Sequence, residues 1–137
     1  MKSILGAALL VAAGSAFAAG GTITVYKDAN CGCCEGWVTH LREAGYQVNA
    51  INSPDMSAVK KRLGVPETLG SCHTGVVDKS GQVIEGHVPA AAVARLIARP
   101  EVKGVAVPGM PANSPGMGKM DGKLVTVDFQ GKPFSKD

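Results

Sequence analysis

Three of the four cysteines in this sequence stand in one short stretch, Cys31-Gly32-Cys33-Cys34, and the fourth is Cys72. Clustered thiols can form structural disulfides, exchange disulfides with a partner, or bind a soft metal ion. Disulfides between adjacent or next-but-one cysteines are strained, so the three clustered sulfurs cannot all serve as ordinary structural bridges. Two bridges stay possible, Cys31–Cys34 and Cys33–Cys72, and a purely structural role therefore remains an alternative.

Side chains that could add further metal ligands stand farther along the chain. They are His73, His87, Met110, Met117 and Met120. Thiolate and thioether ligands with imidazole beside them favour soft ions, above all Cu(I). A zinc site is the nearest alternative, because four cysteines can complete a tetrahedron, although zinc has little use for thioether. Since adjacent thiolates cannot all face one ion, a site with more than one copper ion is a reasonable expectation.

Thiol exchange is the second function that the cysteine stretch suggests. Cys31 and Cys34 have the Cys-x-x-Cys spacing of thioredoxin-like redox motifs, so they are the redox candidates of a thiol-disulfide oxidoreductase. Such enzymes usually carry a cis-proline before their third strand, where this sequence has Cys72-His73-Thr74. A potential metal ligand therefore replaces a substrate-docking residue, which favours copper binding. Whether the protein is an enzyme stays open from the residues alone.

The strands and helices that must position these residues follow from the pattern of apolar residues and turns. A strand over residues 22–27 leads directly into the cysteine stretch, and a helix from about residue 33 to residue 44 follows it. The later elements are expected, in order, as a strand over 46–51, a helix over 53–63 capped by Ser53, strands over 75–78 and 82–87, and a helix over 89–98. The order β-α-β-α-β-β-α predicts an α/β fold, a thioredoxin-like sandwich.

This fold would gather the distant sulfur and nitrogen atoms at one edge of the sheet. The first strand ends at the cysteine stretch, the third strand starts beside it after Cys72, and the fourth strand returns to the same edge at His87. Cysteines at a helix N-terminus are favoured as thiolates, which makes them better nucleophiles and better metal ligands. Helical spacing turns Cys34 inward and leaves Cys31 and Cys33 nearer the surface.

Residues 101–123 form a stretch rich in glycine, proline and methionine, with little periodicity. We expect a C-terminal extension over 101–137 that packs on the thioredoxin-like metal-binding domain of residues 19–100, with residues 124–129 as an extra strand at the sheet edge. An extended chain covers about 3.3 Å per residue. The extension is therefore long enough to bring its methionines back over the cysteines.

Several of these residues also have ordinary structural explanations. Hydrophobic filling or hydrogen bonding within a loop would account for Met110, Met117, His73 and His87. We expect Trp37 to cover the sulfurs from one side and keep water away. His40 and the basic run over 60–62 are expected on solvated faces of their helices.

The N-terminal residues 1–18 have the features of a cleavable export signal. They contain a lysine near the start, an apolar run, and the small-x-small pattern Ala16-Phe17-Ala18. The apolar run is too short to span a bilayer. Export would place the remaining 119 residues in the oxidising periplasm, where disulfides form readily. The net charge of +3 falls to +2 without this segment and no arginine-rich run is present, so no nucleic-acid partner is expected.

Four motifs occur together in a fixed order along the chain. They are CGCC followed by Trp37, SCHT at 71–74, GHVPA at 86–90, and VPGMPANSPGM at 107–117. This combination resembles the CopG-type periplasmic copper-resistance proteins, over roughly residues 22–117. The resemblance implies a thioredoxin-like fold that binds Cu(I) through cysteine sulfurs, and a role in copper redox handling or detoxification.

The same resemblance implies which residues hold the metal. It assigns four copper thiolates, Cys31, Cys33, Cys34 and Cys72. It also makes His87, Met110 and Met117 nearby candidates. A copper efflux protein or a redox protein is the expected partner, and a non-catalytic copper carrier is kept as a further alternative.

Overall fold

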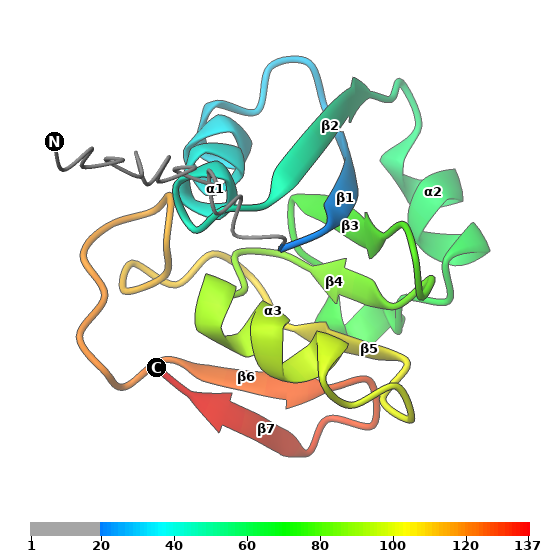
Figure 1. Ribbon diagram of the computed structural model, residues 1–137. Coiled ribbons are helices and arrows are strands. Elements are labelled where there is room, and N and C mark those ends of the chain that lie inside the picture. Colours follow the sequence, from blue (N-terminus) through cyan, green and yellow to red (C-terminus); the bar gives the residue numbers. More distant parts are fainter. Residues whose placement is uncertain (1–19) are drawn as a thin grey trace, which may run out of the picture.

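The computed structural model describes residues 20–137, which form one seven-stranded sheet with three α-helices packed against it (Figure 1). The expected export signal, residues 1–18, lies outside the described residues. The strands are ordered β2-β1-β3-β4-β5-β6-β7 across the sheet. Their bounds are β1 (Thr22–Lys27), β2 (Gln47–Asn52), β3 (His73–Val77), β4 (Val83–Glu85), β5 (Gly104–Ala106), β6 (Val125–Asp128) and β7 (Pro133–Lys136). The helices are α1 (Gly32–Glu43), α2 (Met56–Arg62) and α3 (Ala90–Ile97), with a short 3-10 helix η1 (Glu67–Leu69).

The first four strands have the pairing of a thioredoxin-like sheet. β1 and β2 are parallel and joined by α1, whereas β3 runs antiparallel to β1 and β4 antiparallel to β3. The predicted order of elements and the thioredoxin-like fold are thus confirmed. Lys27 at the end of β1 lies opposite His73 at the start of β3. This register places the loop after β1 beside the loop before β3.

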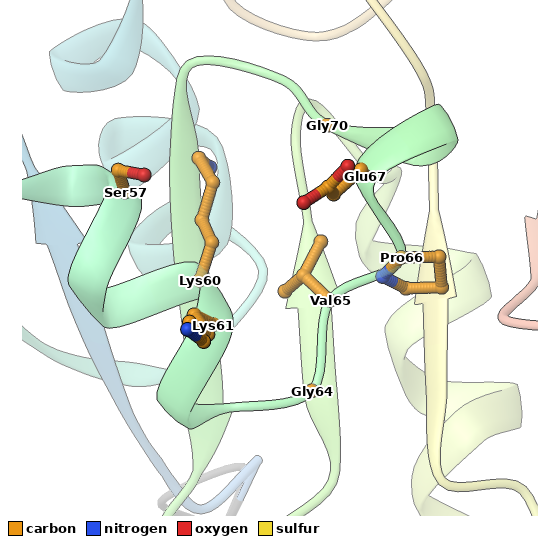
Figure 2. A pocket seen from close by; sticks show the side chains of 8 residues that line it. All are labelled: Ser57, Lys60, Lys61, Gly64, Val65, Pro66, Glu67 and Gly70. Carbon is orange, nitrogen blue, oxygen red and sulfur yellow. The ribbon is translucent and has the colours of Figure 1, made fainter.

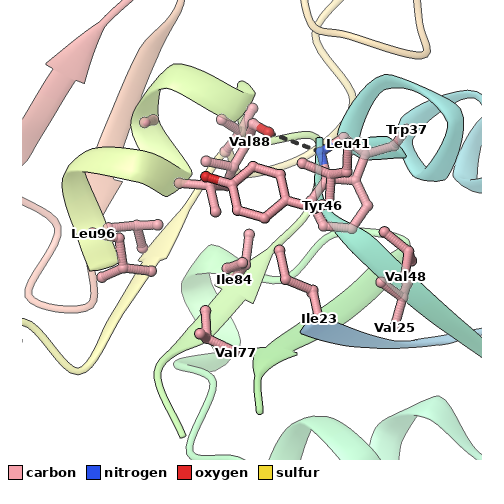
Figure 3. Packing of buried hydrophobic residues seen from close by; sticks show 14 of the residues in the cluster. Ile23, Val25, Trp37, Leu41, Tyr46, Val48, Val77, Ile84, Val88 and Leu96 are labelled. Carbon is pink, nitrogen blue, oxygen red and sulfur yellow. Dashed lines mark hydrogen bonds between the residues drawn. The ribbon is translucent and has the colours of Figure 1, made fainter. Parts of the chain in front are cut away.

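The hydrophobic core lies between the sheet and helices α1 and α3 (Figure 3). Ile23 and Val25 of β1 are fully buried in it, because the side chains of a strand alternate between its two faces. Trp37 covers this layer from α1, and its Nε1 donates a hydrogen bond of 2.8 Å to the carbonyl oxygen of Val88. Replacing a buried tryptophan by alanine typically costs about 3–5 kcal/mol, so Trp37 is a main support of the fold.

Helix α2 packs against the other face of β1, where the guanidinium carbon of Arg62 lies 5.4 Å from the centre of the Tyr26 ring. The helix begins at Met56, because the side chain of Asp55 accepts a hydrogen bond of 2.9 Å from the N–H of Ala58. The prediction that Ser53 caps this helix is wrong. The Ser53 hydroxyl instead accepts a bond from the N–H of Asp55, in the turn before the helix.

The C-terminal extension contains more regular structure than the sequence predicts. β5 lies inside the stretch 101–123, whose sequence shows little periodicity. It pairs in parallel with β4, and all three of its residues are buried. Three consecutive buried residues give no alternation, so their pattern does not distinguish a strand from a loop. Residues 124–129 were expected to form the edge strand. They contain β6, which pairs with both β5 and β7, so β7 forms the edge of the sheet instead.

The predicted surface position of His40 is also wrong. His40 is half-buried on α1, and its Nε2 accepts a hydrogen bond of 3.0 Å from the backbone N–H of Ala90, the first residue of α3. A helix N-terminus leaves backbone N–H groups without partners in the helix. Pro89, which precedes α3, supplies no side-chain cap. His40 therefore caps α3 and links the two helices that cover the core.

We expect His40→Gln to flatten the pH dependence of the free energy of unfolding. Burial lowers the pKa of His40, and the smaller opposing effect comes from Glu43. Only the neutral ring can accept the bond from Ala90. The stabilisation is therefore complete above the unfolded-state pKa of about 6.5 and is lost as the pH falls through the lower folded-state pKa.

Urea unfolding at several pH values from about 7.5 down to about 5 measures this effect. The other two histidines, His73 and His87, are present in both proteins, so their contribution cancels in the comparison. An identical pH dependence of the two proteins would contradict the capping role of His40.

Candidate metal centre

The cysteine stretch forms the start of helix α1, at the edge of the sheet. Cys31 is the extended N-cap residue, and Cys34 follows within the first turn. Cys34 is fully buried and Cys31 and Cys33 are partly exposed, which confirms the predicted orientation of the three side chains. Cys31 and Cys34 are joined by a disulfide, whereas Cys33 and Cys72 are free thiols.

Cys33 lies at the centre of the sulfur cluster. Its Sγ is 3.5 Å from the Sγ of Cys31, 4.0 Å from the Sγ of Cys72 and 4.0 Å from the Sδ of Met110. The four cysteine sulfurs all lie within 4.8 Å of one another. Folding therefore brings Cys72 next to the CGCC turn. While the disulfide persists, Cys31 and Cys34 offer no thiolate, and its reduction would release both as possible metal ligands.

Two histidine rings converge on the sulfur of Cys72. The Nδ1 of His87 lies 2.7 Å from the carbonyl oxygen of Pro115, and the Nε2 of His73 lies 2.9 Å from that of Gly86. A carbonyl oxygen only accepts hydrogen bonds, so each of these ring nitrogens carries the proton of its neutral ring. The lone pairs of His87 Nε2 and His73 Nδ1 consequently face the Cys72 Sγ, at 3.1 Å and 3.3 Å.

The Cys72 sulfur faces two hydrogen-bond acceptors, the nitrogen lone pairs of His73 and His87. A thiol has one S–H and can donate it to only one of the two facing nitrogen lone pairs. The three side chains Cys72, His73 and His87 form a second group whose ligand atoms all lie within 4.8 Å of one another. A metal ion would accept electron density from all three atoms at once, so this group extends the cysteine cluster on one side.

Burial sets the protonation states of this second group. It lowers the pKa of His73 to about 3, with a further lowering from the neighbouring His87, and it also lowers the pKa of His87 itself. Both rings are therefore neutral at neutral pH, the form in which histidine binds metal. Burial raises the pKa of Cys72 to about 11. A metal ion that displaces the thiol proton would stabilise the thiolate.

Trp37 and Lys27 support the centre from inside the molecule. The Trp37 ring stacks on the ring of His73, with 4.3 Å between their centres, and so covers the group from the core, as expected from the sequence. Lys27 is almost fully buried, and its Nζ contacts Glu35 of α1 at 2.7 Å and Asn52 of β2 at 3.0 Å. This ion pair links the first turn of α1 to the end of β1.

The methionine segment, which we define as residues 107–117, covers the centre from the solvent side. Met110 is 53 % exposed although its sulfur lies beside the Cys33 thiol. In the described part of the chain, neither Met117 nor Met120 receives a hydrogen bond from a cysteine of the cluster. The structure thus places the Met110 thioether in contact with the sulfur cluster.

Residues near Met117 hold this segment in place. The Pro115 carbonyl binds His87, and the backbone of Gly116 lies directly against α1, with a positive φ of 90°. A Cβ atom added to Gly116 would come within 2.7 Å of the backbone nitrogen of Trp37 and 3.0 Å of the carbonyl oxygen of Cys33. Only glycine fits this close approach.

A buried ion pair near the centre was not predicted from the sequence. Lys60 was expected to be solvated, but its ammonium group pairs with Glu85, which is fully buried. The sequence signal for it is an acidic residue within the apolar strand Val83–Glu85. A fully buried carboxylate needs a partner, although the sequence does not indicate which of the basic residues supplies it.

We expect Gly116→Ala to destabilise the protein more than Gly122→Ala. Gly122 has a similar positive φ of 76°, but a Cβ added there would meet no atom within 4 Å. Both substitutions carry the backbone strain of a left-handed residue, roughly 1–2 kcal/mol, and only Gly116→Ala adds a collision with α1.

Urea unfolding of the two variants measures the difference in stability. Nitrogen NMR of His87 provides a second measurement, since displacement of the segment removes the Pro115 carbonyl that fixes its tautomer. Equal destabilisation with an unchanged His87 spectrum in both variants would contradict the close packing at Gly116.

The comparisons with known proteins agree with this geometry. A family model described as a protein of unknown function, DUF411, matches residues 69–117. No protein with curated annotation matches the chain. Two solved structures, titled copper resistance protein CopG form 1 and form 2, are 46% and 47% identical to the chain, with TM-scores of 0.75 and 0.74. Each comparison covers 85% of this chain and 97% of the solved one.

The solved structures are matched over nearly their whole length, and residues 69–117 contain Cys72, His87 and the methionine segment. The similarity to the solved structures therefore extends over most of the fold, and the family model covers the part of the candidate metal centre that follows the CGCC turn. On this evidence, the chain belongs to the CopG copper-resistance protein family.

Proposed function

We propose that this protein captures Cu(I) in copper resistance and binds it through Cys31, Cys33, Cys34 and Cys72 when all four are reduced. The observation that carries the proposal is the convergence of the four sulfurs within 4.8 Å of one another. A ligand set dominated by thiolates favours a soft, monovalent ion. The two related structures are copper resistance proteins, which supports copper rather than zinc as that ion.

Donors on both sides of the cluster support a site for more than one copper ion. His73 and His87 direct lone pairs at Cys72, and the Met110 thioether lies beside Cys33. Cys33 and Cys72 therefore have neighbouring donors in two directions and could each bridge two ions. The exposure of Met110 makes it the ligand that an arriving copper ion, or a partner protein, would meet first.

The Cys31–Cys34 disulfide links copper binding to redox state in this proposal. Its reduction takes up two electrons and two protons and yields two thiols, which completes the four-cysteine set. With the disulfide formed, the available donors are Cys33, Cys72, the two histidines and Met110. Electrons could leave the loaded centre through copper or through a pair of thiolates, and a redox or copper-efflux protein would be the partner.

We place this function in the periplasm because residues 1–18 have the pattern of an export signal. An oxidising compartment is one in which the Cys31–Cys34 disulfide would form readily. None of the helices in residues 20–137 has the length and the apolar composition needed to cross a membrane.

A second candidate function is thiol-disulfide exchange, which the disulfide between Cys31 and Cys34 favours. Cys31 is partly exposed at the helix start and its disulfide partner Cys34 is fully buried. An accessible sulfur can exchange with a substrate while the buried sulfur resolves the mixed disulfide. A metal-free oxidoreductase would reduce insulin, would be inhibited by copper and would keep its activity in Cys72→Ser.

We expect the reduced protein to compete with a strong Cu(I) chelator in an anaerobic titration, and Cys72→Ser to compete less well. Changes to groups that only orient metal ligands already lower affinity by about 10–100-fold, so loss of a ligand should lower it at least as much. Insulin reduction by the same two proteins tests the alternative. Undiminished copper affinity in Cys72→Ser would overturn the proposed function.

We also expect the reduced protein to bind more Cu(I) than the protein that retains the Cys31–Cys34 disulfide. The reason is that two of the four thiolates are withdrawn by the bond. Counting bound copper after gel filtration under anaerobic conditions measures the difference, and mass spectrometry verifies the redox state. An equal copper content of both forms would exclude Cys31 and Cys34 as ligands.

His87→Gln is expected to lower the Cu(I) affinity of the reduced protein, whereas His40→Gln is expected to leave it unchanged. Of these two residues, only His87 directs a ring nitrogen at the cluster, while His40 caps a helix. The same chelator titration measures both variants. Equal affinities in His87→Gln and the wild type would remove His87 from the donor set.

A further inference from the structure

A carboxylate is buried beneath the metal centre, on the sheet face that α2 covers. Glu85 is the last residue of β4 and has no exposed surface. One of its oxygens, Oε2, accepts a hydrogen bond of 2.6 Å from the hydroxyl of Thr74 on the adjacent strand. The other, Oε1, accepts a bond from the ammonium group of Lys60 and a bond of 2.8 Å from the backbone N–H of Ser71.

Lys60 reaches this carboxylate from helix α2. Its side chain lines a cavity between α2 and the segment 64–70 (Figure 2). The cavity has a volume of about 500 Å³. Burial of a carboxylate is costly unless a cation and hydrogen-bond donors surround it. Lys60 supplies the cation. Lys61 lines the same cavity, but it is exposed and forms no ion pair within residues 20–137.

The contacts of Glu85 lead directly into the loops of the metal centre. The Glu85 carboxylate accepts a hydrogen bond from the backbone N–H of Ser71, the residue directly before Cys72. The Ser71 hydroxyl donates a hydrogen bond to the carbonyl oxygen of Gly109, within the methionine segment. The backbone carbonyl of Glu85 accepts a bond of 3.0 Å from the N–H of Val107, the first residue of the methionine segment. Both loops that face Cys33 are therefore tied to this one residue.

We propose that Glu85 is a positioning residue of the metal centre. Its carboxylate, neutralised by Lys60, holds Ser71 so that the Cys72 thiol and the methionine segment both face Cys33. Glu85 touches no sulfur of the cluster, and it acts through the loop that it anchors. This role rests on the proposed copper function, because it concerns the same thiols. Groups that orient metal ligands commonly set metal affinity in this way.

The test compares three variants with the wild type. Glu85→Gln keeps the size of the side chain but removes its charge, so it weakens the contacts to Lys60 and Ser71. Lys61→Met removes a neighbouring lysine, which lines the same cavity but forms no ion pair with Glu85. Val59→Ala removes buried volume from α2 and controls for a general loss of stability.

Two measurements distinguish positioning from stability. The first is the Cu(I) affinity of the reduced protein in competition with a chelator, which Glu85→Gln should lower by about tenfold or more. The second uses no metal. Iodoacetamide alkylation of Cys72, followed by mass spectrometry, should become several-fold faster in Glu85→Gln because the loop is released. Lys61→Met and Val59→Ala should match the wild type in both measurements.

Unchanged copper affinity and alkylation rate in Glu85→Gln would overturn the positioning role. Equal changes in Val59→Ala would also overturn it, because loss of stability would then explain the result. If Glu85→Gln does not fold, Lys60→Met serves instead and Lys60→Arg should restore both values. A wild-type protein that fails to compete for Cu(I) would overturn the proposed function, and the alkylation of Cys72 would then decide the positioning role alone.

Discussion

The metal centre depends on one constraint, the antiparallel register between β1 and β3. Because Lys27 lies opposite His73, the chain leaving β1 meets the chain entering β3, and the CGCC turn lies beside Cys72. β4 then reverses direction and β5 runs parallel to β4, so His87 and the methionine segment reach the same sheet edge. A shift of one residue would turn His73 to the other face of the sheet, and the group around Cys72 would not form.

Within this frame, backbone carbonyl oxygens determine what the histidines can bind. Pro115 and Gly86 each hold one ring nitrogen as a donor, which leaves the other nitrogen of His87 and His73 as a lone pair facing sulfur. Burial keeps both rings neutral, since the charged form is poorly solvated. The two histidines therefore present lone pairs toward Cys72 without a change of tautomer.

The fold and most of the centre follow from local patterns in the sequence. Alternation in Thr22–Lys27, helical spacing after Cys33 and glycine-containing turns predict the order of the first seven elements, and that order predicts where Cys72 and His87 lie. The features that the sequence did not predict depend on contacts between residues far apart in the chain. β5 is too short to show a period, and neither the pairing of Lys60 with Glu85 nor the cap from His40 to Ala90 has a local signal.

X-ray absorption at the copper edge of the Cu(I)-loaded, reduced protein tests the central claim most directly, because it identifies the atoms bound to copper. Our account predicts a shell dominated by sulfur, with a smaller nitrogen contribution and a copper–copper signal from thiolates that bridge two ions. A shell of nitrogen and oxygen without sulfur would contradict it. Copper would then be bound away from the place where folding brings the four cysteines together.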